Sequence, residues 1–271
     1  MFTVLLIGSS ALADDSLLNK PDAEVRASLH AELGTLAVLS HRIQFSTDGT
    51  EIDYLEDGGQ DNLFPTARLS AELHAGPRNT VVFLYQPLVL ESQSLIQRDL
   101  TLDGVTFPAG TAVDFRYGFS FWRGSYLRDL VEDPDGEFSI GASLQIRNAT
   151  IEFEDRASGL LISNRDIGPV PVIKLRGRKA LEDDLWVGFE ADGFYAPIKY
   201  INGSNSDVVG AILDASVRGG LTLNNGAETF VNLRYLWGGA EGTSNDFTPP
   251  GDGYTENWLH FLNLSLGFSL R

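Results

Sequence analysis

The chain has 271 residues, no cysteine, and 37 acidic against 20 basic side chains, for a formal net charge of −17. So large an acidic excess argues against a nucleic-acid-binding surface and against docking on anionic lipid through a basic patch. The lack of cysteine fits a protein that crosses an oxidising compartment without disulfides. With 28 glycines and a mean hydropathy near zero, the composition suits neither a helical membrane protein nor a disordered chain.

The first residues have the features of a secretion signal. Residues 2–7 form a short apolar core, and Ser10-Ala11-Leu12-Ala13 supplies the small residues that signal peptidase reads. We expect residues 1–13 to be a signal peptide, truncated at its start because no basic residue precedes Lys20, and residues 14–271 to form one domain. The alternative is that the apolar core is a buried first strand.

Apolar and polar residues alternate with a period of two along most of the remaining chain. In residues 262–270 every second residue is Leu or Phe, and similar alternation occurs at 138–147, 209–218 and 67–74. Such alternation predicts β-strands with one apolar face and one polar face.

Two features favour a membrane barrel over a soluble β-sandwich. Several alternating runs exceed the 9–11 residues that a tilted membrane-spanning strand needs, and no apolar run is long enough for a membrane helix. Tight turns such as 133–136 and 224–226 alternate with longer connections such as 93–110 and 240–255, as periplasmic turns and extracellular loops do in outer-membrane barrels. The sequence therefore predicts an all-β, antiparallel, up-and-down transmembrane β-barrel of about ten strands, with eight or twelve left open.

An even number of strands would place both ends of the barrel domain on the periplasmic side. We expect Pro169 and Pro171 to interrupt strand pairing in the sixth strand, because proline cannot donate a ladder hydrogen bond. The expected strands are 27–46, 64–75, 80–92, 111–130, 137–153, 160–178, 185–196, 208–223, 228–238 and 257–270.

Aromatic residues are assigned to the lipid-facing surface. Trp237 and Trp258 end and begin neighbouring strands, so they should meet at one rim together with Tyr195, where amphipathic rings favour the headgroup layer. Four further aromatic residues, at alternate positions of the fourth strand, are also expected to face lipid: Phe115, Tyr117, Phe119 and Phe121. The alternative is that these rings pack in the core of a soluble protein.

The end of the chain resembles a known class of protein. The alternating residues 263–270 look like the C-terminal insertion strand of Gram-negative outer-membrane proteins. Residues 48–54 and 143–149 are similar to segments of an uncharacterised proteobacterial outer-membrane family. The resemblance implies a β-barrel in the outer membrane, with the lipid, the lipopolysaccharide and the barrel-insertion machinery as its partners, and it implies no activity.

Charged residues fall on the face opposite to lipid in the expected register. Charges inside a barrel must be paired or hydrated, and a near balance of signs predicts ion pairs and not a selectivity ring. Because ten strands leave little space inside, we expect a plugged lumen, with a narrow polar conduit or a small-solute pocket as the alternative. The candidate lumen-lining residues are Arg68, Glu72, Arg116, Arg147, Glu190, Asp192, Asp214, Arg218 and Arg234.

Few patterns in the sequence point to catalysis. It holds no cysteine pair, no His-Glu-x-x-His and no phosphate-binding loop, so we expect no metal and no cofactor. His41 and His260 should lie near the outer rim, where Ser40 could join either in a Ser–His arrangement. Six carboxylates in 48–62 match no calcium loop, and we expect them to be solvated.

The expected function is therefore a structural, narrow-channel or small-solute-binding role in the outer membrane, with a polar, largely ion-paired lumen. The alternative is a surface enzyme that acts on lipid or peptide, for which no catalytic residues are assigned. We expect no nucleic-acid partner, and the sequence specifies neither a solute nor an oligomeric state.

Overall fold

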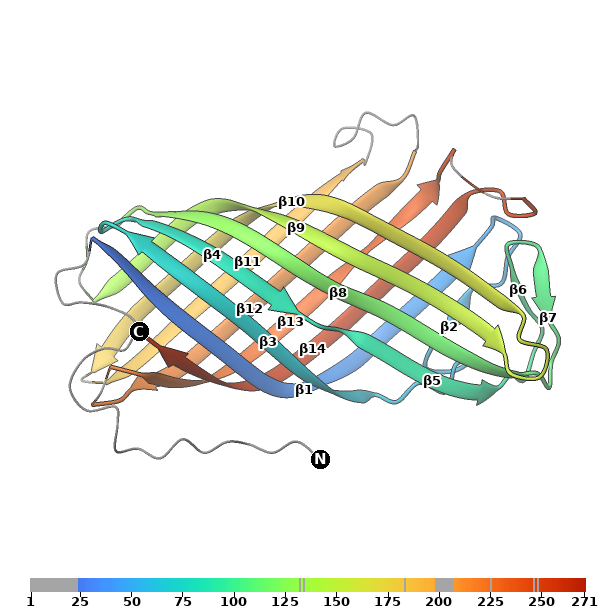
Figure 1. Ribbon diagram of the computed structural model, residues 1–271, viewed down its shortest axis with the longest axis horizontal. Coiled ribbons are helices and arrows are strands. Elements are labelled where there is room, and N and C mark those ends of the chain that lie inside the picture. The colour runs from blue at the N-terminus through green and yellow to red at the C-terminus, as the bar shows by residue number, and fades with distance from the viewer. Residues whose placement is uncertain are drawn as a thin grey trace.

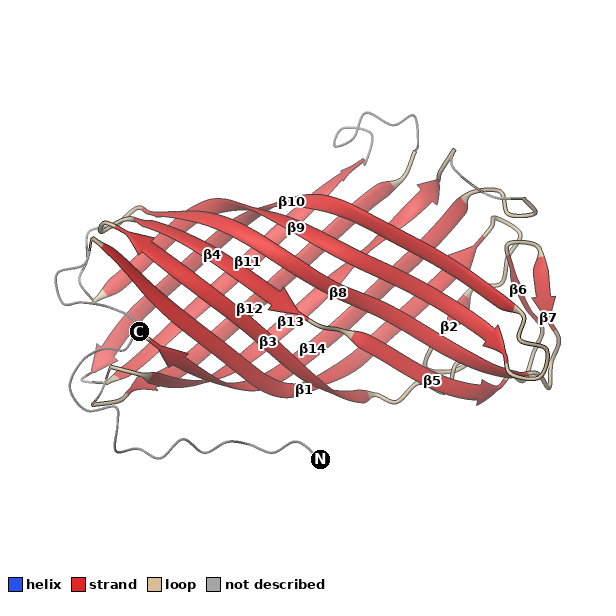
Figure 2. Ribbon diagram, in the orientation of Figure 1, coloured by secondary structure: helices blue, strands red, loops and turns tan. Residues whose placement is uncertain are grey.

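Ten long antiparallel strand segments, tilted across the barrel axis, close on themselves in the computed structural model (Figures 1 and 2). Closure comes from pairing of the last strand with the first, in register from Leu29 opposite Leu270 to Phe45 opposite Thr255. The structure describes residues 24–131, 133, 135–182, 184–197, 207–224, 226–245, 247 and 249–271. The expected signal peptide, residues 1–13, lies outside them.

The expected fold class and the count of ten strands are confirmed, and the strand bounds lie close to the expected ones. The expected strand 80–92 is split at Pro87, and its two parts pair with the same neighbour. No helix in the described parts of the chain is long and apolar enough to span a membrane. The wall consists of β1 (Val25–Phe45), β3 (Leu63–Ala75), β4 and β5 (Asn79–Gln86 and Val89–Leu95), β8 (Ala112–Asp129), β9 (Gly136–Asp155), β10 (Leu161–Glu182), β11 (Leu185–Pro197), β12 (Val209–Thr222), β13 (Glu228–Thr243) and β14 (Tyr254–Leu270).

Three short strands lie at the end of the barrel opposite the start of β1 and the end of β14. They are β2 (Ile52–Asp53), which pairs with β1, and the hairpin of β6 (Leu100–Leu102) and β7 (Val105–Phe107) (Figure 1). Following the usual orientation of outer-membrane barrels, we call this the outer end and the other the inner end.

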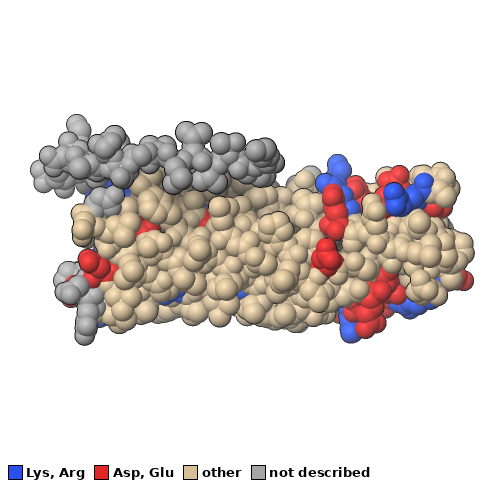
Figure 3. Space-filling model, turned by 90° about the horizontal axis from the view of Figure 1, so that it is seen from below, with Lys and Arg blue, Asp and Glu red and all other residues tan. Residues whose placement is uncertain are grey.

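The outer surface carries an apolar belt around the inner and middle parts of the barrel. Leu33, Leu144, Leu213 and Leu266 lie in it with 36–69% of their surface exposed. Charged side chains gather on the outer surface towards the outer end (Figure 3). Strands of up to 22 residues exceed the length needed to cross a membrane, so we expect the barrel to project beyond the outer interface.

The interior changes character along the barrel axis. In the inner half the inward positions are polar or charged, as at Glu72, Asp192 and Arg234, whereas in the outer half they are apolar or aromatic. The expected polar lumen is therefore restricted to the inner half. The outer half is filled by an apolar core that includes Leu36, Phe45, Ile52, Tyr54, Leu90, Phe107, Phe115, Tyr117, Phe121, Phe153 and Phe261.

The expectation that the aromatic residues of β8 face lipid is wrong. Phe115, Tyr117, Phe119 and Phe121 are buried inside the barrel. The outward side of this part of β8 carries Arg116, which is paired with acidic side chains on neighbouring strands. Beyond the membrane the outer surface meets water, so the apolar face of a strand turns to the interior, as in a soluble barrel.

The wall has an open seam between β10 and β11 in its outer half. Pairing of these strands runs from Glu182 opposite Leu185 to Ile173 opposite Gly193 and ends there, although β10 continues outward to Leu161. β10 diverges from β11 and β12 beyond this point (Figure 1). On its other edge β10 stays paired with β9 through Pro169 and Pro171 without a register shift. The backbone N–H groups that these prolines lack would therefore point to the unpaired β11 side, which is where proline is tolerated in edge strands. The expected interruption at the prolines is thus present.

Candidate functional site

The inner half of the lumen is closed by a layer of buried ion pairs. Arg123 on β8 lies 2.9 Å from carboxylate oxygens of both Asp192 and Asp214. Asp192 also lies 2.9 Å from Nζ of Lys174, and Asp214 accepts hydrogen bonds from Arg234. These five side chains are at most 4% exposed, so each charge is neutralised by partners and not by water.

Ion pairs also cross the lumen between strands on opposite sides of the barrel. Arg176 on β10 donates two hydrogen bonds to Glu72 on β3, at 2.9 and 3.0 Å. Arg68, on β3, lies 3.7 Å from Glu190 on β11. Because removing one partner of a buried pair leaves an uncompensated charge, these contacts fix the two sides of the wall to each other and obstruct the passage between them.

The structure places eight of the nine expected lumen-lining residues on the inward face. Arg116 is the exception, and its assignment is wrong: it lies outside, 3.1 Å from Glu91 and 3.0 Å from Glu152, with 42% of its side chain exposed. The inward residues are Arg68, Glu72, Arg147, Glu190, Asp192, Asp214, Arg218 and Arg234.

Several members of the ion-pair layer were not identified from the sequence. They include Arg123, Lys174, Arg176 and Glu32, which lies 3.5 Å from Arg218 and accepts hydrogen bonds from Asn232 and Ser265. Arg123 was missed because it shares a face with the aromatic residues that were assigned to lipid. Arg123 lies on the same face of β8 as Phe121, which is two residues earlier. A charged residue on that face indicated that the face turns to the interior of the barrel. Lys174 and Arg176 follow Pro169 and Pro171 on β10. Because strand pairing was expected to be interrupted there, the sequence did not show which of these residues face the lumen.

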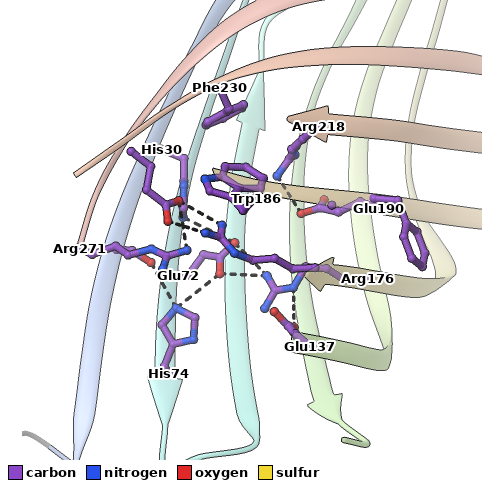
Figure 4. A pocket seen from close by; sticks show the side chains of 16 residues that line it. His30, Glu72, His74, Glu137, Arg176, Trp186, Glu190, Arg218, Phe230 and Arg271 are labelled. Carbon is purple, nitrogen blue, oxygen red and sulfur yellow. Dashed lines mark hydrogen bonds and ion pairs between the residues drawn. The ribbon is translucent and has the colours of Figure 1, made fainter. Parts of the chain in front are cut away.

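A small hollow of about 70 Å³ opens at the inner mouth of the barrel (Figure 4). His30 and His74 lie on either side of Glu72, with their Nε2 atoms 3.7 and 3.6 Å from its carboxylate oxygens. Arg178 packs over the ring of Trp186 at 3.9 Å and donates to Glu228, at 2.6 and 3.1 Å. The charges that line this hollow pair with one another, so it continues the ion-pair layer.

A larger pocket of about 260 Å³ lies in the outer half, next to the seam. The seam residues Gly168, Pro169 and Val170 line it from β10, and Phe194 lines it from β11. Most of its remaining lining is apolar, and we call it the wall pocket. Its further lining residues are Phe119, Gln145, Arg147, Gly210, Ala211, Ile212, Leu236, Trp237, Gly238, Gly239, Ala240 and Leu259.

Two polar side chains of β9 line the wall pocket. The Oε1 atom of Gln145 accepts hydrogen bonds from Nε and Nη2 of Arg123, at 3.0 and 2.6 Å. This fixes the amide so that Nε2 of Gln145 points away from Arg123, and Nε2 is buried without a hydrogen-bond partner. Arg147, two residues further along the same face, brings a guanidinium to the pocket. The ion-pair layer thus ends where the apolar pocket begins, and donors lie at the boundary.

The histidines near the outer rim do not come together. His41 is fully buried in the apolar core, stacked on Tyr54 at 4.0 Å between ring centres. His260 lies on the outer face of the wall, where its Nδ1 is 2.7 Å from the hydroxyl of Tyr235. Ser40 is opposite His260 in the strand register. A Ser–His arrangement could therefore involve Ser40 and His260 alone, on the surface that faces outward.

The aromatic residues expected at the rim lie on the outer surface. The rings of Trp237 and Trp258 are stacked, with centres 5.6 Å apart, and Tyr195 is 73% exposed. Together they mark the interfacial level that we expect for the outer edge of the membrane.

The acidic connection 48–62 is held by basic side chains. Arg98 donates to both carboxylate oxygens of Asp57, at 2.8 and 2.7 Å. Arg42 lies 3.5 Å from both Glu51 and Asp53. Within the described ranges, no three His, Cys, Asp or Glu side chains are placed to hold a metal ion.

No protein-family model matches the chain, and no curated protein matches its sequence. Among solved structures, the barrel is similar to the outer-membrane protease OmpT of Escherichia coli, with 13% identity and a TM-score of 0.50 over 90% of this chain and 96% of that one. Lower TM-scores, 0.40 and 0.37, relate it to the transport unit of the autotransporter AIDA-I of Escherichia coli (9% identity, 96% and 95% covered) and to Ail of Yersinia pestis (7%, 90% and 98%). The chain therefore has the fold of Gram-negative outer-membrane β-barrels, and its apolar belt agrees with localisation in the outer membrane.

Proposed function

We propose that the protein is a plugged outer-membrane barrel that binds a small, mainly apolar solute in the wall pocket and does not form an open pore. The observation that carries the proposal is the pocket itself. Concave, mainly apolar pockets with a few placed polar groups are the usual form of small-molecule sites, and this one has that composition.

The interior on either side of the pocket supports binding over conduction. Towards the inner end, the pairs of Arg123 with Asp192 and Asp214 fill the lumen. Towards the outer end, the apolar core around Tyr54 and Phe115 fills it. A polar solute that crossed the barrel would have to break buried ion pairs and then pass through an apolar layer, whereas an apolar solute can rest at the boundary.

A fluorescent apolar probe tests this proposal on the purified, folded barrel in a non-ionic detergent. We expect N-phenyl-1-naphthylamine to bind saturably with a stoichiometry of one. Val170→Trp, which fills the pocket from β10, should abolish that saturable component. Val217→Trp, the matched change at a residue 57% exposed on the apolar belt, should leave it unchanged. Equal binding by the native chain and both variants would show that the probe binds elsewhere.

A further inference from the structure

The wall pocket contains a buried donor that the protein leaves unpaired. Gln145 is fully buried, and the two hydrogen bonds that its Oε1 accepts from Arg123 fix the orientation of its amide. Its Nε2 carries two N–H groups and has no hydrogen-bond partner within the described part of the chain. Because a buried donor without an acceptor costs free energy, an acceptor brought by a ligand would gain affinity at this amide.

The strand register directs this donor to the pocket. Gln145 lies opposite Arg123 on β8 and opposite Val170 on β10. Since Oε1 faces Arg123, Nε2 points away from β8, and the apolar side chain of Val170 offers it no acceptor. Gln145 and Val170 both line the wall pocket. The unpaired N–H groups therefore belong to the pocket and not to the ion-pair layer.

The charges near the pocket already have partners, which favours an uncharged ligand. Arg123 pairs with Asp192 and Asp214. Arg147, the charged residue that lines the pocket, has interactions of its own within the protein, so neither guanidinium is assigned to the ligand. A neutral oxygen can accept a hydrogen bond from the amide of Gln145 without burying a charge, whereas a carboxylate would have to lose its hydration in a mainly apolar pocket.

From these observations we propose that the wall pocket binds an uncharged, mainly apolar carbonyl compound, such as a ketone or an ester. The carbonyl oxygen accepts a hydrogen bond from Nε2 of Gln145, and the apolar part of the ligand packs against lining residues such as Phe119, Phe194 and Leu236. This assignment rests on the proposed function and names the ligand class of the same pocket.

Competition against N-phenyl-1-naphthylamine tests the assignment, with acetophenone and α-methylstyrene as the competing ligands. The two molecules have the same shape, because α-methylstyrene has a methylene group where acetophenone has its carbonyl oxygen. The measured quantity is the ratio of the concentrations at which each displaces half of the probe. The cost of removing the carbonyl from water is the same for every variant, so it cancels when this ratio is compared between variants.

Removing the donor should act on acetophenone alone. In Gln145→Met we expect the ratio to shift against acetophenone by about tenfold, the loss that one unmet buried hydrogen bond produces. Gln86→Met is the matched control. Gln86 is also a buried glutamine whose Oε1 accepts from an arginine, Arg234, but it does not line the wall pocket, so the native ratio should be retained.

A second variant covers the case in which Gln145→Met does not fold. Gln145→Glu keeps an acceptor for Arg123 and replaces the N–H donor with a second acceptor oxygen. It should shift the ratio in the same direction, because an acceptor in the ligand then meets an acceptor in the protein.

The outcomes separate the two proposals. If the ratio is the same in the native barrel and in the variants of Gln145 that fold, or if acetophenone fails to displace the probe from the native barrel, the carbonyl assignment is wrong and the pocket remains an apolar site. If N-phenyl-1-naphthylamine does not bind saturably to the native barrel, the proposed function fails first, and this assignment falls with it.

The hydrogen bond also has a spectroscopic signature. The infrared C=O stretch of acetophenone, isotope-labelled at its carbonyl, should move to lower frequency on binding to the native barrel than in an apolar solvent, because a donor weakens the C=O bond. That shift should be lost in Gln145→Met and retained in Gln86→Met. A shift that persists in Gln145→Met would show that another group donates to the ligand and would overturn the assignment to Gln145.

Discussion

Arg123 on β8 and Asp214 on β12 form an ion pair across the lumen, with Nη1 and Oδ2 2.9 Å apart and both side chains at most 3% exposed. Asp192 lies at the same distance from the same guanidinium nitrogen. The single arginine therefore neutralises carboxylates from two neighbouring strands of the opposite wall.

Replacing Arg123 with Met should destabilise the barrel by about 3–5 kcal/mol, because it leaves two buried carboxylates with fewer cations. Urea unfolding in lipid vesicles, followed by tryptophan fluorescence, measures the change. The control is Arg116→Met, whose pairs with Glu91 and Glu152 are partly exposed and should be worth at most about 1 kcal/mol. If the two variants unfolded at the same urea concentration, the ion-pair layer would not be a structural element.

The filled lumen predicts small or intermittent single-channel conductance in planar bilayers, well below that of a wide porin. The double variant Glu190→Gln, Asp192→Asn removes acceptors for Arg68, Lys174 and Arg123. It should lower stability and increase leak, since the uncompensated cations attract water and counter-ions into the layer. Large, steady conductance from the native chain would be incompatible with the plug.

Much of this fold is encoded locally, in the period-two alternation and in the turn sequences between the strands. Alternation identifies strands and their apolar faces, and the spacing of turns gives their number. This is why ten strands, and the interruption at Pro169 and Pro171, could be predicted from the sequence.

What the sequence did not reveal is where each strand leaves the membrane. The rule that apolar residues face lipid holds at Leu144 but reverses at Phe115, because the outer surface there meets water. Parity alone cannot detect that reversal. Within the sequence, Arg123 on the same face as Phe121 is the sign of it, and in the structure Glu91 and Glu152 on neighbouring strands lie beside the outward Arg116.

The candidate site was predictable only in part for the same reason. The inward orientation of the charged residues between Glu190 and Arg234 can be predicted from the alternation of polar and apolar residues within each strand. The wall pocket depends on which strands fail to pair and on how residues of seven strands converge, and neither property has a sequence period. Gln145, whose amide is oriented by Arg123, could not be distinguished from any other polar residue of β9.

The apolar belt predicts the cost of charges at its centre. Leu144 and Leu213, 51% and 36% exposed, should each cost about 2–4 kcal/mol when replaced by Arg, if they lie near the bilayer midplane. Leu130, 53% exposed and directly after the inner end of β8, is the matched control and should cost about 0–1 kcal/mol as Arg. Spin labels at Leu144 and Leu213 should also be reached by lipid-soluble quenchers. Labels reached only by water-soluble quenchers would show that the belt is not in contact with lipid.

The contact of Arg98 with Asp57 joins two extracellular connections and should make one of them sensitive to acid. Arg98 also donates to the backbone carbonyl of Glu51, at 2.7 Å. Partial burial alone would raise the pKa of Asp57, but the hydrogen bonds from Arg98 and from the Asp53 backbone outweigh it and lower that pKa. Since the folded pKa lies below the unfolded value of about 3.9, the contact stabilises the connection fully above that pH. Its contribution is lost as the pH falls through the folded pKa.

Hydrogen exchange of residues 54–62 measures this contribution directly. We expect protection at pH 7 that declines below about pH 4. Arg98→Ala should exchange faster at pH 7 and depend less on pH in the acid range. Arg156→Ala removes a contact with Asp114 at the same end of the barrel and should leave 54–62 unchanged, which separates loss of the clamp from a general loosening. Protection in Arg98→Ala equal to that of the native chain at pH 7 would mean that β2 and the backbone bonds hold this connection without the ion pair.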